Sequence, residues 1–308
     1  MPVDFVTVVT ADNVRNLGLQ ARSIAKFIEP RSVGSINIIV NSFTPDHLYQ
    51  ILLTEVVEHY GPLKEQVEIY PISRFARPHL NCSQDVIGEA AAMLMSRILE
   101  SPYFVLMRPG DHFIQPARAN DFGDQGGGRS RAARVEARPH QLRKAAASFE
   151  VLNVPLPEIG AEFVADQLPF VFGVAEVRRL VDLLEGQYSA PLDDIFAKVA
   201  GAIDPVYLYI AFTMRASTEI RDVFKVGPRM ISGLKLDDGN HTIDAWIEDA
   251  QKRILANVDA LAEAAADKAV EAKLTQFWVD CGLFENDVAA AAALPGAGRS
   301  HVAAMVDA

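Results

Sequence analysis

Four short apolar runs, separated by amphipathic segments, organise the first third of the chain. The runs are rich in β-branched and aromatic residues and end at polar or glycine-containing turns, which is typical of buried strands. They cover residues 5–10, 36–40, 67–70 and 103–107. The segments between them place apolar residues at helical spacing, over 17–28, 45–60 and 83–99. Strands that alternate with helices predict an α/β fold, with a mostly parallel sheet flanked by helices.

Polar residues follow each predicted strand. They are Thr10 and Asp12, Asn41, Arg74 and Arg77, and finally the turn Arg108-Pro109-Gly110-Asp111. Right-handed crossovers bring the carboxyl ends of parallel strands to one edge of the sheet, where open α/β sheets bind ligands. We therefore expect these side chains to line one ligand-binding edge.

The middle of the chain has a less regular pattern. Residues 120–138 contain three successive glycines and closely spaced arginines, which predicts a mobile loop. Helices are predicted over 139–152 and 175–185, and a strand over 168–172. Residues 204–214 fit either a buried helix or a buried strand.

The last part of the chain predicts helices. From 243 to about 290 the apolar residues recur at helical spacing and alanine is frequent. We expect a domain over 1–240 that carries the site, followed by a helical C-terminal extension over 241–308. The apolar faces of that extension would pack either on the domain or on a second copy of the chain.

Composition narrows the class of protein. Of the 308 residues, 50% are hydrophobic, and the formal net charge is −11. Such an acidic surface repels phosphate groups, which argues against binding to nucleic acid or to an anionic membrane. The two cysteines, Cys82 and Cys281, lie far apart and predict no disulfide framework. Without a signal-peptide pattern or an apolar run of about 18 residues, we expect a cytoplasmic protein with no transmembrane segment.

The order of several short motifs resembles a bacterial glycosyltransferase-like domain of unknown function in the GT-A nucleotide-sugar glycosyltransferase superfamily. The matching motifs are Arg22-Ser23-Ile24, Val40-Asn41, Gln84 near a helix start, Phe113-Ile114-Gln115-Pro116, Leu168-Pro169-Phe170-Val171-Phe172 and Asp204-Pro205-Val206-Tyr207-Leu208-Tyr209. The resemblance covers residues 3 to 245. It implies transfer of a sugar from a nucleotide-sugar donor to a glycan or lipid-linked acceptor, in surface polysaccharide synthesis.

Two family positions differ in this chain. The Asp-x-Asp motif of the family falls on Arg108-Pro109-Gly110, which leaves Asp111 as the nearby acid, and the family's glutamate falls on Pro205, next to Asp204. The resemblance implies that Asp111, with a late histidine such as His241, binds Mn²⁺ or Mg²⁺ on the donor diphosphate. The alternative is a metal-independent site, in which the guanidinium of Arg108 binds the phosphate oxygens.

Other candidate residues have a functional and a structural interpretation. Asp204 is the candidate catalytic base of an inverting transfer, or the cap of a helix that begins at Pro205. Gln84 would contact the donor, or belong to a helix start that Ser83 caps. Two other functions stay open: a non-catalytic relative that binds a glycan or a protein, and a nucleotidyltransferase, which normally needs two carboxylates on its metals.

Overall fold

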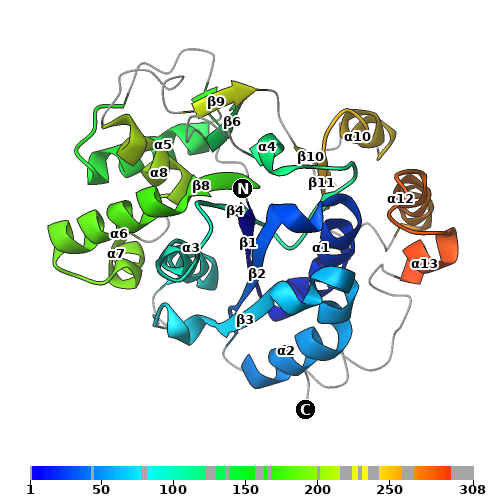
Figure 1. Ribbon diagram of the computed structural model, residues 1–308. Helices are drawn as coiled ribbons and strands as arrows, with labels where there is room; N and C mark the ends of the chain where they lie inside the picture. Colours follow the sequence, from blue (N-terminus) through cyan, green and yellow to red (C-terminus); the bar gives the residue numbers. More distant parts are fainter. Residues whose placement is uncertain are drawn as a thin grey trace.

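Figure 1 shows the computed structural model of the protein. It describes residues 2–42, 45–77, 79, 82–122, 130–135, 139–156, 163–164, 168–199, 202–215, 224–227, 231–234, 243–258 and 267–292. At its centre lies a five-stranded sheet in the order β3-β2-β1-β4-β8. Its strands are β1 (Val3–Val9), β2 (Val33–Val40), β3 (Val67–Pro71), β4 (Tyr103–Met107) and β8 (Phe170–Gly173). The first four are parallel and β8 runs antiparallel to β4, which confirms the predicted mostly parallel sheet.

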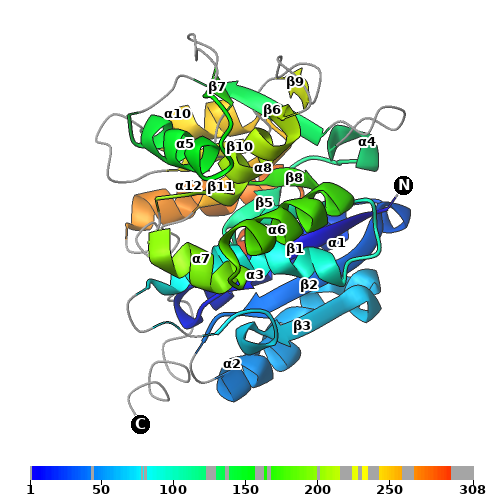
Figure 2. The ribbon, with the colours of Figure 1, turned by 90° about the vertical axis from the view of Figure 1, so that its left-hand side faces the viewer.

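Helices cover both faces of this sheet because its strands are apolar on both sides. Along β4, Phe104 and Leu106 face one apolar cluster, whereas Val105 and Met107 face the other. The first face is covered by α3 (Gln84–Leu94), α5 (Pro139–Val151), α6 (Val174–Tyr188), α7 (Leu192–Val199) and α8 (Pro205–Met214). The second is covered by α1 (Val14–Phe27), α2 (Pro45–Ile51) and the turns of π and 3-10 helix over Leu52–Val56 and Val57–Gln66. Figures 1 and 2 show these two layers.

The caps of two helices follow the sequence pattern. The side chain of Ser83 accepts a hydrogen bond from the backbone of Val86 at the start of α3. At the start of α8, Asp204 accepts one from the backbone of Val206, and Pro205 occupies the first turn. Residues 205–214 are therefore helical, which resolves the open choice between helix and strand.

The prediction of helices from 243 to about 290 is wrong at one segment. Helices α10 (Ile243–Ala250), α12 (Lys268–Asp280) and α13 (Asp287–Ala292) are present, but β11 (Leu255–Val258) lies between them. This strand is buried along its length and pairs with β5 (Asp111–Phe113) and β10 (Ile231–Leu234). A short apolar run does not distinguish helix from strand, and here pairing with distant strands decides.

The predicted loop over 120–138 is also partly wrong. Residues Ala119–Phe122 form the short helix α4, and Ser130–Val135 form β6. Strand β6 pairs with β9 (Phe224–Gly227) and β7 (Phe163–Val164), which come much later in the chain. The glycine-rich sequence 123–129 lies outside the described residues. Among the helices that the structure describes, none has the length and apolar character to cross a bilayer.

His112 and Trp278 join helix α12 to strand β5. Both side chains are fully buried, and Trp278 Nε1 donates a hydrogen bond of 3.1 Å to His112 Nε2. Because indole only donates, Nε2 is the acceptor, and the proton sits on Nδ1, which lies 3.0 Å from the carbonyl oxygen of Gly110. Burial lowers the pKa of His112 to about 4, so this imidazole is neutral at physiological pH.

We expect the protein to lose stability as the pH falls from about 6.5 towards 4, because the unfolded histidine binds a proton that the folded one does not. The loss from His112 approaches about 1.4 kcal/mol per pH unit in this window. Urea unfolding of the wild type, His112→Gln and the exposed control His140→Gln at several pH values measures it. Only His112→Gln should reduce the dependence of the free energy of unfolding on pH. Equal dependence in all three proteins would contradict a neutral, buried His112.

Candidate ligand-binding site

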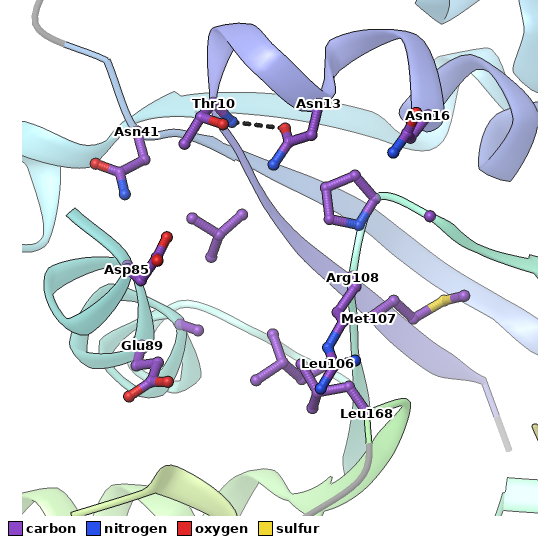
Figure 3. A pocket seen from close by; sticks show the side chains of 15 residues that line it. Thr10, Asn13, Asn16, Asn41, Asp85, Glu89, Leu106, Met107, Arg108 and Leu168 are labelled. Carbon is purple, nitrogen blue, oxygen red and sulfur yellow. Dashed lines mark hydrogen bonds between the residues drawn. The ribbon is translucent and has the colours of Figure 1, made fainter. Parts of the chain in front are cut away.

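A pocket of about 320 Å³ opens at the carboxyl ends of β1, β2 and β4. Helix α3 forms one wall, and the turn after β4 forms the opposite one (Figure 3). Its polar lining residues are Thr10, Asn13, Asn16, Asn41, Asp85, Glu89 and Arg108. The pocket therefore lies at the sheet edge that the sequence predicts, and three of the predicted residues, Thr10, Asn41 and Arg108, line it.

Helix α3 packs closely on the ends of the strands because Gly88 has no side chain. A Cβ there would lie 2.9 Å from Val8 Cγ1 and 3.2 Å from Asn41 Nδ2. The amide of Asn41 also donates a hydrogen bond of 2.8 Å to the carbonyl oxygen of Gln84. Gln84 therefore contacts the site residue Asn41 through its backbone carbonyl oxygen. Its side chain does not line the pocket. This packing places Asp85 and Glu89 next to the carboxyl ends of the strands.

The turn that carries Arg108 is tied to helix α1. Gln20 Nε2 donates to the carbonyl oxygens of Arg108 (2.7 Å) and Asp111 (3.2 Å), and Gln20 Oε1 accepts from Thr7 Oγ1 (2.9 Å). The turn closes through the backbone N–H of Asp111, which donates to the Arg108 carbonyl oxygen at 3.0 Å. The side chain of Arg108 is exposed and lines the pocket. Nothing in the sequence singled out Gln20, since its partners lie far along the chain.

Asp111 lies behind this turn and is fully buried. Its Oδ2 accepts a hydrogen bond of 2.7 Å from the backbone N–H of Arg108, and its Oδ1 accepts one of 2.7 Å from Asn257 Nδ2. Asp111 is absent from the described residues that line the pocket. The carboxylate of Asp111 therefore stabilises the turn that carries Arg108. The side chain that lines the pocket is Arg108, not Asp111.

Glu89 is a site residue that the sequence reasoning missed. It lines the pocket from α3, and burial, followed by the charge of Asp204, raises the pKa of its carboxyl group to about 8. Asp85, one turn earlier, adds to this rise, while Lys144 and Arg108 oppose it. The available signal was the spacing of Asp85 and Glu89, which places two acids on one helix face at the sheet edge.

Asp204 lies near Glu89 but outside the set of lining residues. Its Oδ1 accepts from the backbone of Val206, and its Oδ2 lies 3.4 Å from Lys144 Nζ on α5. Its side chain is largely buried. The predicted cap is therefore present, and the same carboxylate sits in a small cluster of charges next to the pocket.

The remaining predicted residues lie elsewhere on the sheet edge. Asp12 is exposed on the 3-10 helix η1 (Ala11–Asn13) and does not line the pocket. Arg74 stacks its guanidinium over the ring of Tyr70, 4.6 Å from its centroid. Arg77 pairs with Asp193 and Asp194 at the start of α7. His241 lies outside the described residues.

One group of described side chains has a donor set suited to a metal ion. The ligand atoms of His79, Asp193 and Asp194 lie within 4.8 Å of one another. Nε2 of His79 is 3.4 Å from Asp193 and 3.5 Å from Asp194. Arg77 already contacts both carboxylates, so a cation there would compete with a guanidinium.

Comparison by sequence identifies no relative: no family model matches the chain, and no curated protein matches it. By structure, the chain is similar to several glycosyltransferases. Mouse xyloside xylosyltransferase 1, in its apo form, matches with 10% identity and a TM-score of 0.47, over 84% of this chain and 98% of that one. An active-site mutant of LgtC matches with 10% identity and a TM-score of 0.43, over 90% and 96%.

A third similar structure is the bifunctional glycosyltransferase WbbM in its apo form. It matches with 12% identity and a TM-score of 0.44, over 83% of this chain and 45% of that one. At identities this low, the similarity concerns the fold alone.

Proposed function

We propose that the protein is a glycosyltransferase of the hexosyl-transferring type. It would move a sugar from a nucleotide-sugar donor to a glycan or lipid-linked acceptor, for a surface polysaccharide. The observation that carries this proposal is the exposed guanidinium of Arg108 in a pocket at the carboxyl edge of parallel strands. That edge is where α/β sheets bind ligands, and the guanidinium fork matches the geometry of phosphate oxygens.

The lining residues suit the parts of such a donor. Asn13, Asn16 and Asn41 present amides, which donate and accept hydrogen bonds and so fit a nucleobase or a ribose. Arg108 would neutralise the charge that develops on the leaving diphosphate. An inverting transfer also needs a carboxylate that takes the proton of the acceptor hydroxyl, and Asp204, beside Glu89, stays the proposed base.

We propose that this chemistry does not depend on a metal ion at Asp111. Both carboxylate oxygens of Asp111 accept hydrogen bonds from within the protein, and Asp111 is not among the residues that line the pocket. A hard cation such as Mg²⁺ or Mn²⁺ needs oxygen ligands that face it. The donor set around Asp111 therefore does not fit the metal of the Asp-x-Asp motif, and Arg108 supplies the positive charge instead.

A ligand panel tests the proposed function. Nucleoside diphosphates, nucleotide sugars and glycans are added separately to the protein in EDTA and, in parallel, in Mn²⁺, and the unfolding temperature is measured. We expect at least one nucleotide to raise the unfolding temperature in EDTA, because ligands that bind the folded state stabilise it. A shift that requires Mn²⁺ would contradict the role of Arg108. A shift with glycans alone would indicate the non-catalytic binding protein.

A further inference from the structure

We propose that Glu89 binds the nucleoside diphosphate as a neutral hydrogen-bond donor, so that ligand and proton bind together. The inference rests on the proposed function, because it takes an anionic ligand held by Arg108 as its starting point. It assigns a binding role to a side chain that the motifs of the sequence do not mark, and it makes the affinity of the pocket depend on pH.

The position of Glu89 is the first observation. The side chain projects from α3 into the same pocket as Arg108, which lies across from it (Figure 3). Among the residues that the structure describes, its carboxyl group has no hydrogen-bond or ion-pair partner. Glu89 is half-buried, and a carboxyl group that is partly removed from water and has no partner in the protein is costly to keep charged. A ligand in the pocket would supply the missing partner.

The neighbouring charges are the second observation. Three elements face Glu89 besides its own helix: α5 with Lys144, the start of α8 with Asp204, and the turn after β4 with Arg108. The ammonium group of Lys144 contacts Asp204, at 3.4 Å, and so is shared with that acid. Asp85 on α3 adds a further negative charge. Burial and Asp204 dominate this balance and raise the pKa of Glu89 to about 8, so the group is mainly protonated at pH 7.

A protonated carboxyl group changes what the pocket can hold. It carries an O–H that can donate to a phosphate oxygen, whereas a carboxylate only accepts and would repel that oxygen. An anion bound beside it disfavours the charged form further and raises its pKa again. Binding above pH 8 therefore takes up a proton, and by reciprocity the loss of that proton weakens binding.

Titration calorimetry measures this linkage. The probe is the nucleoside diphosphate that gives the largest thermal shift in the panel, titrated between pH 7.5 and 9.5, where its phosphates keep a constant charge. The proteins are the wild type, Glu89→Gln and the control Glu150→Gln, which changes an exposed acid on α5. Glutamine has nearly the shape of the protonated acid and keeps an N–H donor but does not titrate.

For the wild type and Glu150→Gln, we expect the dissociation constant to rise above pH 8, with a limit of about tenfold per pH unit for one linked proton. Glu89→Gln should show no such rise and should bind more tightly than the wild type at pH 9.5. Titrations of the wild type in buffers of different ionisation enthalpy should show uptake of close to one proton at the alkaline end, which tests the inference without any variant.

The outcomes separate this inference from the proposed function. Binding with the same pH dependence in the wild type and Glu89→Gln, or without proton uptake by the wild type, would overturn the role of Glu89 and leave the nucleotide site standing. If no nucleoside diphosphate binds the wild type at any pH, the proposed function fails, and this inference fails with it.

Discussion

Replacing Arg108 with alanine lowers the affinity for a nucleoside diphosphate by about 100-fold, the largest effect on binding that we expect from one change in the pocket. The guanidinium is exposed in the pocket and would make two charge-assisted hydrogen bonds to the diphosphate. At such an exposed position we take the low end of their range, about 1.5 kcal/mol each, which together corresponds to a loss of this size. Arg108→Lys keeps the charge but loses the planar fork, so we expect an intermediate loss of about tenfold. Titration calorimetry in EDTA measures both.

Arg31→Ala is the matched control for this change. Arg31 is 90% exposed and pairs with Glu29 on the surface, away from the pocket lining. Its loss lowers the net positive charge by the same amount but should leave the dissociation constant unchanged within about twofold, because solvent and salt screen distant surface charges. Equal losses in Arg108→Ala and Arg31→Ala would mean that the nucleotide responds to overall charge and not to this side chain.

Asp111→Asn lowers the free energy of unfolding by about 3 kcal/mol. The two oxygens of Asp111 each accept from a donor, the backbone N–H of Arg108 on one side and the amide of Asn257 on the other. An asparagine has one oxygen and one NH₂ group, and only its oxygen can accept from the fixed backbone N–H of Arg108. Its NH₂ group then faces the NH₂ group of Asn257, whose amide has to rotate and give up its present contacts in a site without solvent. Urea unfolding monitored by circular dichroism measures the loss.

Asp121→Asn is the control for Asp111→Asn. Asp121 accepts a hydrogen bond of 2.8 Å from the backbone of Arg118, three residues earlier, as Asp111 does from Arg108, but this contact is exposed. We expect a loss below about 1 kcal/mol there, since water can replace the partner. Unchanged stability of Asp111→Asn together with lost sugar transfer would instead show that Asp111 touches the donor, as the family resemblance implies.

The sequence predicts well those elements whose formation depends on residues within the same segment. The run 103–107 coincides with β4. Pro102 and Arg108-Pro109 bound this apolar stretch, which is too short for a helix and is typical of a buried strand. The caps Ser83 and Asp204 follow for a similar reason, because a side chain of their own segment satisfies the first backbone donors of the helix.

The parts that the sequence does not predict depend on partners from distant segments. Strand β11 lies between helices and forms because β5 and β10 pair with it. Gln20 supports the Arg108 turn across 88 positions of sequence, and no local pattern marks it. The raised pKa of Glu89 depends on Asp204, which reaches α3 only after the chain has folded. The sequence thus located the sheet edge and Arg108, but not the side chains that set the charge of the pocket.

A crystal structure of the protein with a nucleoside diphosphate, grown in EDTA, tests the central claim most directly. The account predicts that the diphosphate lies between α3 and the turn after β4, with its oxygens within about 3.2 Å of the Arg108 guanidinium nitrogens. A nucleotide bound elsewhere, or one whose phosphates avoid Arg108 in this pocket, would contradict it.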